Sequence, residues 1–339
     1  MTPWSLSLRA WWAPVLVATV ASSALALGAD TGDLPFFVHA ADDLFTTAWE
    51  DAYANPDLQI GPIQLFLLAL ADAAAKALSV STITLLAFAV PLGVTGLLLV
   101  VLRRLLADRP ERRRLVLLLA GLAAVVLGIP VSAYVDGHLA QVVVPLLWLL
   151  AALRAQEGRA VSAGALVGVS AGFELWGMLG AVVLLLAPRL REAAAGFAVQ
   201  VAVLVALLAP FALLGELRMF DYHWVVNGDT LLSVFVEPGT DFTWWMRLAQ
   251  GGAALAVGAA LTWPLRRTLH AVWLGPLAVV VVRLALDPVR YPWYWLALQT
   301  LVVVGAVELL TSERLLRALH PDRLSSSSAR APALHARRP

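Results

Sequence analysis

Long apolar runs separated by short clusters of arginine constrain this chain more than any other feature. An apolar run of roughly 20 residues is long enough to cross the hydrocarbon core of a bilayer. Nineteen of the 24 basic residues fall in clusters beside such runs: Arg9, 103–114, Arg154 with Arg159, Arg189 with Arg191, Arg266 with Arg267, and 314–338. Under the positive-inside rule these clusters are predicted to be cytoplasmic. Five basic residues remain for the other side: Lys76, Arg218, Arg247, Arg283 and Arg290.

Composition agrees with this interpretation. The chain is 60% hydrophobic and only 14% charged, with a mean hydropathy of +0.81, whereas about a quarter of a soluble domain is charged. We therefore predict an all-α polytopic membrane protein with about ten membrane helices, some of them short or broken. The predicted spans are 11–28, 80–102, 115–134, 139–153, 160–173, 176–188, 193–214, 244–263, 268–286 and 293–311. The first resembles a signal peptide ending Ala24-Leu25-Ala26, but the many later spans favour its retention.

The predicted outer side is acidic, with sixteen acidic residues against five basic ones. This asymmetry argues against a nucleic-acid partner. The absence of cysteine excludes disulfides and thiolate metal sites. The chain also lacks a Walker loop, a dinucleotide-binding glycine motif, a zinc-protease motif and a serine-hydrolase motif. Nucleotide-powered transport is therefore not supported.

The stretch 29–79 is predicted to be one external segment. Within it, residues 62–78 are apolar but carry Asp72 and Lys76 among alanines. If this stretch crossed the membrane, the arginine cluster at 103–114 would lie outside, so we predict an amphipathic helix in the outer interface. Residues 1–311 are expected to form one transmembrane domain. Residues 312–339 are expected to be a disordered, basic cytoplasmic tail that contacts lipid head groups.

Residues 160–188 must leave the cytoplasm and return to it, yet two full spans would need about 40 residues. We predict two short helices that break at 173–177, where irregular backbone is buried in protein or lines a cavity. Gly164, Gly168 and Gly172 form a small-residue face that allows close approach of a neighbouring helix.

The candidate site lies in the external segment, where the seven carboxylates of residues 30–57 are interspersed with aromatic rings that can stack on sugar faces. Asp33 stands out because it follows the first predicted span by only a few residues, where the membrane surface meets lipid head groups. Four short motifs accompany it: Gly32-Asp33-x-x-Phe36-Phe37, Tyr53-x-x-Pro56-Asp57-x-Gln59-x-Gly61-Pro62, Gly137-His138-x-x-Gln141, and Asp287-Pro288 followed by Tyr291 and Tyr294.

With these motifs and the broken helix pair, the chain resembles the polyprenyl-phosphate-dependent mannosyltransferases of actinobacteria, which belong to the GT-C superfamily of membrane glycosyltransferases. The resemblance implies an inverting transfer of a sugar, mannose or another pentose or hexose, from a lipid phosphate carrier to an envelope glycolipid or glycan. Asp33 matches the general base. The resemblance implies no cofactor beyond the lipid-linked sugar and leaves a need for a divalent metal open.

Ten further residues are expected to bind substrate. The leaving phosphate needs cationic or hydrogen-bonding partners; Arg290 is the first choice, followed by His138, His223 and Arg218. The other expected substrate-binding residues are Tyr53, Gln59, Gln141, Glu174, Tyr291 and Tyr294. The enzyme is expected in the plasma membrane, with both termini cytoplasmic and the site outside. We expect Asp33, His138, Glu174 and Arg290 to converge on one cavity.

Several alternatives remain open. Arg290 could instead be an interfacial anchor beside its aromatic neighbours, and His223 a structural loop residue. Arg283 and Asp287, spaced i, i+4, are expected to pair. Glu174 contributes to acceptor binding, pairs with an arginine such as Arg247 or Arg283, or marks an altered, inactive site. At the level of function, the alternatives are a transporter or flippase of a lipid-linked precursor and a catalytically silent relative.

Overall fold

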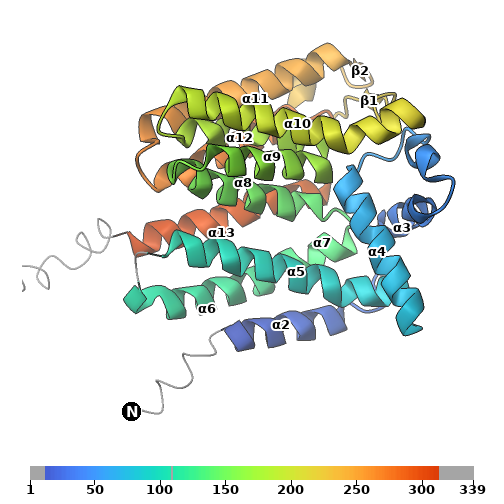
Figure 1. Cartoon of the computed structure of the whole chain (residues 1–339), viewed down its shortest axis with the longest axis horizontal. Helices are drawn as coiled ribbons and strands as arrows, with labels where there is room; N and C mark the ends of the chain where they lie inside the picture. The colour runs from blue at the N-terminus through green and yellow to red at the C-terminus, as the bar shows by residue number, and fades with distance from the viewer. Residues whose placement is uncertain (1–11, 108–109, 313–339) are drawn as a thin grey trace, which may run out of the picture.

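The chain folds into a bundle of roughly parallel helices, with smaller helices and a short hairpin across one end (Figure 1). The computed structural model describes residues 12–107 and 110–312. Arg9 and the predicted tail, apart from Ser312, lie outside the described residues. The bundle helices are α2 (Trp12–Leu25), α5 (Thr82–Leu105), α6 (Pro110–Val126), α7 (Ile129–Val135), α8 (Ala140–Gln156), α9 (Ala160–Phe173), η4 (Leu175–Leu186), α10 (Leu190–Leu214), α11 (Trp244–Leu265), α12 (His270–Ala285) and α13 (Trp295–Thr311).

Within the described residues, five helices are long and apolar enough to cross a membrane: Thr82–Leu105, Arg114–Val135, Leu190–Leu214, Trp244–Leu265 and Pro292–Thr311. Five shorter apolar helices accompany them: Trp12–Leu25, Ala140–Gln156, Ala160–Phe173, Leu175–Leu186 and His270–Ala285. Together they coincide with the ten predicted spans, so the predicted positions of the apolar helices and the nearly all-helical fold are confirmed. How many of them cross stays a prediction.

Helix α8 lies at the centre of the bundle, because 14 of its 17 residues are buried. Its Trp148 is fully buried, and the indole N–H donates to the Gly177 carbonyl oxygen at 2.9 Å and to Ser170 Oγ at 3.0 Å. These bonds satisfy the buried indole and hold α8 against the junction of α9 and η4.

The predicted break between the two short helices is confirmed. Helix α9 ends at Phe173, Glu174 has extended backbone angles, and the 3-10 helix η4 begins at Leu175. The glycine face of α9 packs on α10, because a Cβ at Gly164 would overlap the Gly196 backbone and one at Gly168 would meet Val203 at 2.6 Å. The interpretation of these glycines as a packing surface is therefore confirmed.

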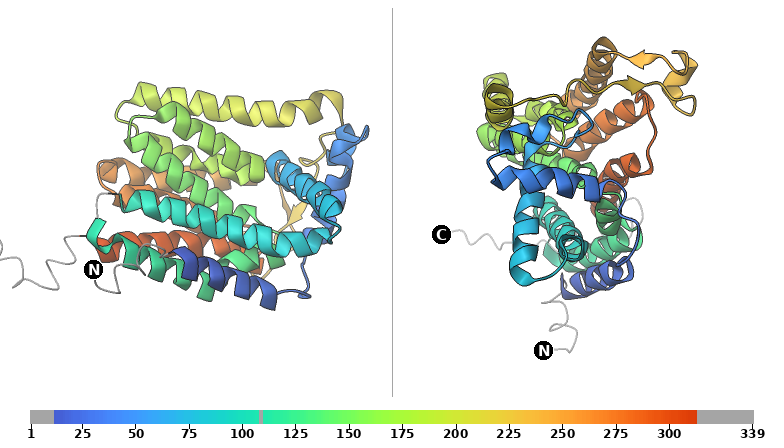
Figure 2. Two further views of the ribbon diagram at one scale, coloured as in Figure 1. Left: turned by 60° about the horizontal axis from the view of Figure 1, so that its bottom comes forward. Right: turned by 90° about the vertical axis from the view of Figure 1, so that its right-hand side faces the viewer.

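The external segment forms α3 (Leu34–Asp42), η2 (Asp43–Phe45), η3 (Trp49–Tyr53) and α4 (Pro62–Leu78). Helix α4 runs across the ends of the bundle helices, not along them (Figures 1 and 2). It buries Leu65, Leu68 and Asp72 against the protein while Phe66 and Leu70 are exposed. This two-faced helix lying across the bundle end agrees with the amphipathic, non-spanning helix expected there.

Charge separates along the bundle axis. The described arginine clusters lie at one end, where α5, α8 and α11 terminate, while the acidic segment with α3 and α4 lies at the other (Figure 1). We call these the arginine end and the carboxylate end. The structure thus places the two predicted sides at opposite ends of one body.

The long loop after α10 contains a structure that the sequence did not predict. Strands β1 (Trp224–Val225) and β2 (Asp241–Phe242) pair antiparallel, with Trp224 opposite Phe242. The turn between them includes the short helix η5 (Leu231–Val234). We call residues 224–242 the outer hairpin. The short helix η6 (Pro292–Tyr294) precedes α13.

Candidate functional site at the carboxylate end

Asp33 lies just before α3, and its carboxylate is not used to cap that helix. Although it occupies the N-cap position, its side chain makes no capping hydrogen bond. Asp33 Oδ2 instead lies 3.0 Å from His138 Nε2, and 53% of the Asp33 side chain is exposed against 14% of His138. A carboxylate only accepts hydrogen bonds, so His138 Nε2 must carry the proton in this bond.

A glycine allows the two loops that carry this pair to touch. Gly137 has a φ of +74°, and a Cβ there would lie 2.7 Å from the Leu34 backbone nitrogen. Glycine tolerates both the left-handed backbone and the close approach. The turn before α8 therefore packs on the start of α3, which brings His138 to Asp33.

The hydrogen bond sets the charge of Asp33. Bonding to His138 lowers the pKa of the Asp33 carboxyl below its ordinary value of 3.8, against the opposing effect of partial burial, and the charge of His138 lowers it further. A hydrogen bond to the charged form stabilises that form. Asp33 is therefore ionised throughout the neutral range.

An aromatic stack extends from His138. Its ring stacks on Trp293 with centroids 4.4 Å apart, and Trp293 stacks on Tyr291 at 4.5 Å, both nearly parallel at 7°. Phe37 meets His138 edge-on at 5.5 Å, and Tyr294 meets Tyr291 in the same way. The expected residues Asp33, His138, Tyr291 and Tyr294 thus belong to one cluster, with a flat aromatic surface beside an exposed carboxylate.

A buried charge cluster adjoins this stack through Tyr294. Arg283 and Asp287 are only 5% and 2% exposed, and Arg283 Nη2 lies 3.9 Å from Asp287 Oδ2. The predicted pairing is confirmed, although Asp287 follows the end of α12. Gln250 Nε2 donates to the Arg283 carbonyl oxygen at 3.0 Å. The Arg283 guanidinium lies over Trp176 at 4.6 Å and over Tyr294 at 4.9 Å.

Tyr291 lies within electrostatic reach of both the exposed Asp33 and the buried Asp287. Burial raises the pKa of its hydroxyl, and the charges of Tyr222, Asp33 and Asp287 raise it further. The charges of Asp287 and Glu174 act on Arg247, whose guanidinium lies over the rings of Trp224 and Phe242 of the outer hairpin. Asp33, Asp287, Arg247 and Arg283 therefore interact through their charges as one electrostatic unit.

Three donors in this unit have no acceptor among the described residues. They are Arg283 Nη1, Trp176 Nε1 and Trp293 Nε1, all inaccessible to solvent at the atom itself. Leaving a buried donor unpaired costs about 1–3 kcal/mol, so buried donors nearly always have a partner. These three unpaired donors belong to side chains in and beside the aromatic stack.

Glu174 joins the unit through the helix break. Its Oε2 accepts a hydrogen bond from Gln141 Nε2 at 2.9 Å, and its charge acts on Arg247 and Tyr294. Gln141 Oε1 is buried and has no partner among the described residues. Gln141 thus holds Glu174 in place at the break between α9 and η4. The negative charge of Glu174 lies close enough to Arg247 to stabilise the positive charge of that arginine.

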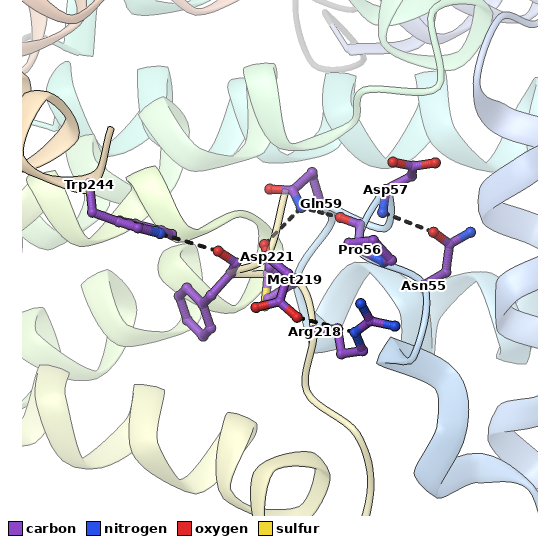
Figure 3. Close-up of polar contacts among 9 residues, drawn as sticks. Asn55, Pro56, Asp57, Gln59, Arg218, Met219, Asp221 and Trp244 are labelled. Atoms are coloured by element: carbon purple, nitrogen blue, oxygen red, sulfur yellow. Dashed lines mark hydrogen bonds and ion pairs between the residues drawn. The ribbon is translucent and has the colours of Figure 1, made fainter. Parts of the chain in front are cut away.

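Two other expected residues hold the external segment together. The Tyr53 hydroxyl is fully buried and donates to the Ile60 carbonyl oxygen at 3.0 Å. Gln59 Nε2 donates to the carbonyl oxygens of Pro56, at 2.6 Å, and Met219, at 2.9 Å (Figure 3). These contacts tie the segment to the loop after α10, so the local geometry gives both residues a structural role.

The remaining candidates lie on the surface. Arg218 Nε bonds Asp221 Oδ2 at 3.1 Å on the loop that Gln59 contacts (Figure 3), and His223 is exposed. Arg290 is also exposed and lies over Trp295 at 5.3 Å. The geometry of Arg290 matches the interfacial anchor considered as its alternative. Of the four residues expected to converge on one cavity, Asp33 and His138 are in contact, Glu174 bonds Gln141, and Arg290 lies over Trp295 instead.

Two further features bear on ligands. Among the described residues, no three His, Asp or Glu side chains are grouped to hold a metal ion. A cavity of about 400 Å³ lies at the arginine end, lined by residues of the α9 and α10 starts that include Arg159 and Glu192. It shares no residue with the cluster around Asp33, and its position away from the aromatic stack makes it a poor candidate for the same chemistry.

Sequence reasoning missed the roles of Trp293 and Trp176. Trp293 had a signal, because it stands between two tyrosines that the motifs had marked. Trp176 had none beyond its place in the helix break. Arg283 was expected to pair with Asp287 or with Glu174, and its unpaired donor Nη1 depends on packing that the spacing does not reveal.

In comparisons with known proteins, no family model, no curated protein and no solved structure matches the chain.

Proposed function

We propose that this chain is a multi-pass plasma-membrane glycosyltransferase of GT-C type. It transfers mannose or another pentose or hexose from a polyprenyl-phosphate donor to an envelope glycolipid or glycan, with both termini in the cytoplasm and the site outside. The observation that carries the proposal is the exposed Asp33 carboxylate, which is held ionised by His138 beside the aromatic stack. Without a nucleotide-binding motif, the activated sugar must come from the membrane itself.

The proposed reaction is a single displacement. The acceptor hydroxyl oxygen attacks the anomeric carbon, its proton passes to Asp33, and the bond between that carbon and the phosphate oxygen breaks. Polyprenyl phosphate leaves with the bonding electron pair. Asp33 has a low pKa for a base, but the acceptor hydroxyl becomes acidic as the new bond forms, so transfer to an already ionised carboxylate is favourable late in the step.

In the proposed reaction the leaving phosphate is bound by the donors that lack an acceptor among the described residues. Arg283 Nη1 and Trp176 Nε1 come from neighbouring side chains, and Trp293 Nε1 comes from the ring that stacks on His138. Hydrogen bonds aimed at a leaving oxyanion stabilise the transition state, the more so away from water. We therefore assign Arg283 as the phosphate partner in preference to Arg290. His138 acts as a positioning residue for Asp33.

Loss of the base tests the proposal. Membranes with wild-type or Asp33→Asn protein are incubated with radiolabelled polyprenyl-phosphate mannose, or the arabinose analogue, and lipid acceptors. We expect Asp33→Asn to lower the rate of glycoside formation about 10²–10⁴-fold, the usual contribution of a general base. The matched control is Asp57→Asn, an exposed acid of the same segment, which should retain activity. Equal product from Asp33→Asn and wild type would refute the assignment.

A transporter of a lipid-linked precursor is the second candidate. The broken pair α9 and η4 together with the buried charges at Arg283 and Asp287 favours it, because transporters use broken helices and intramembrane charges. The same assay separates the two functions: movement of label across sealed vesicles without a new glycoside indicates transport. Absence of both indicates a silent relative, for which Glu174 would be the altered position.

A further inference from the structure

The outer hairpin presents apolar side chains that the protein itself does not cover. Leu231 is 57% exposed, Val234 73% and Phe235 76%. All three lie in the turn between β1 and β2, within or next to η5. We call them the hairpin tip. Single exposed apolar residues are ordinary, but three within five positions on one turn form a patch that calls for a partner.

The tip is held in a fixed shape. Val226, Leu232 and Phe242 form a small core of their own inside the hairpin. Val226 N donates to the Thr240 carbonyl oxygen, and Gly239 N donates to the Val226 carbonyl oxygen. Ser233 Oγ donates to the Thr230 carbonyl oxygen at 2.7 Å. The apolar residues of the turn are therefore divided between this core and the tip, and the tip residues are exposed by a defined backbone and not by local fraying.

The position of the hairpin identifies its partner. Viewed from the carboxylate end, the hairpin extends sideways past the helices (Figure 2, right). It leaves the bundle beside α11, where Trp245 is 80% exposed and Leu248 62%. Indole rings at the start of an apolar helix mark the boundary between membrane and water. The tip thus continues, at that boundary, the apolar outer surface of a helix long enough to cross a membrane.

The charges of the hairpin narrow the partner further. Residues 224–242 contain three acids, Asp229, Glu237 and Asp241, and no lysine or arginine. Such a segment has no electrostatic attraction to anionic head groups. Its association must come from apolar burial, so it should not require anionic lipid and should not weaken in salt.

We propose that the outer hairpin is a lipid-embedded arm, with Leu231, Val234 and Phe235 inserted into the outer leaflet beside α11. Its base connects directly to the candidate site. Asn227 N donates to the Pro288 carbonyl oxygen at 2.8 Å, next to Asp287, and the guanidinium of Arg247 lies over the rings of Trp224 and Phe242. The arm therefore lies between lipid and the buried charge cluster. The proposal concerns membrane contact alone and does not depend on the glycosyltransferase assignment.

The chain contains no cysteine, so one introduced thiol reports on one position. Full-length Phe235→Cys and Val234→Cys are each labelled with a polarity-sensitive fluorophore and reconstituted in phosphatidylcholine vesicles, with or without nitroxide groups on the acyl chains. The matched control is Asp229→Cys on the same turn. We expect labels at 234 and 235 to emit at shorter wavelength and to be quenched by the nitroxide lipid, unchanged in high salt. The label at 229 should behave as in water.

Two outcomes would overturn the proposal. Water-like emission without quenching at both 234 and 235 would show that the tip does not enter lipid. Disulfide formation between copies at position 235, again without quenching, would assign the tip to a second copy of the chain instead. Because either variant can be read alone, failure of one to fold leaves the other as the test.

Discussion

An imidazole N–H holds the Asp33 carboxylate in place and keeps it ionised, which is the state that the proposed general base requires. The same ring stacks on Trp293, which fixes the plane from which the hydrogen bond is donated. The site thus depends on directed contacts between few side chains. Removing one hydrogen-bonding group should therefore change the property that this bond controls, such as the pKa of Asp33.

Replacing His138 by phenylalanine should preserve the stack but remove the hydrogen bond. The pKa of Asp33 is lowered mainly by that bond, so its loss raises the pKa toward 3.8 or above. The acid limb of the rate profile should therefore move to higher pH, since Asp33 would be protonated earlier as pH falls. Transfer rate against pH tests this. An unshifted limb, with reduced rate at all pH values, would indicate that His138 does not tune Asp33.

The Asp33–His138 contact also links stability to pH. A carboxyl whose folded pKa is depressed stabilises the fold above its unfolded pKa, and the contribution is lost as pH falls through the folded value. Since the folded pKa of Asp33 lies below 3.8, this contribution should be constant at neutral pH and vanish only in strong acid.

Breaking the buried ion pair should destabilise the protein. Asp287→Ala leaves Arg283 buried without its carboxylate, which costs about 3–5 kcal/mol in comparable pairs. Thermal unfolding in detergent, followed by tryptophan fluorescence, should show a lower midpoint. The double variant Asp287→Ala with Arg283→Met removes both charges and should recover much of the loss. A double variant as unstable as the single would mean that packing, not charge, dominates at this position.

Helices α9 and α10 approach each other closely, because glycines remove side chains from their interface. A Cβ at Gly164 would overlap the Gly196 backbone. Helix approach of this kind maximises dispersion contacts where lipid offers no hydrophobic driving force. The packing of α9 on α10 is therefore sensitive to added volume at these glycines.

Gly164→Ala should push α9 from α10 and destabilise the protein by about 1–3 kcal/mol, the usual cost of overpacking. Gly252→Ala is the matched control, because Gly252 lies in α11 with no atom within 4 Å of the added Cβ. It should be neutral or slightly stabilising, since alanine favours the helix. Unfolding midpoints of the two variants in the same detergent provide the comparison. Equal midpoints would argue against a tight α9–α10 contact.

For the whole molecule, the placement of the arginine clusters and of the acidic external segment at opposite ends makes orientation the central prediction. A cysteine placed at Asp57 should react with an impermeant maleimide in intact cells. A cysteine at Glu157, which lies at the arginine end beside Arg154, should react only after permeabilisation. The reverse pattern would place the candidate site in the cytoplasm and remove the proposed donor from reach.

The sequence by itself determined where the apolar helices lie, where α9 breaks and how charge divides between the two ends. These features follow from local composition. The length of an apolar run and the arginines that flank it can be read from neighbouring residues in the sequence. The motifs also marked Asp33, His138, Tyr291 and Tyr294 in advance.

Only the tertiary structure decided which of the marked residues meet. Asp33 and His138 are 105 residues apart, and their contact requires the turn at Gly137 to pack on α3. Tyr53 and Gln59, marked equally by the motifs, instead bond backbone carbonyls of the loops they join. The unpaired donors on Arg283 and Trp176, and the hairpin beside them, arise where separate elements pack together. Contacts between distant segments depend on the geometry of the whole bundle, which no local pattern in the sequence contains.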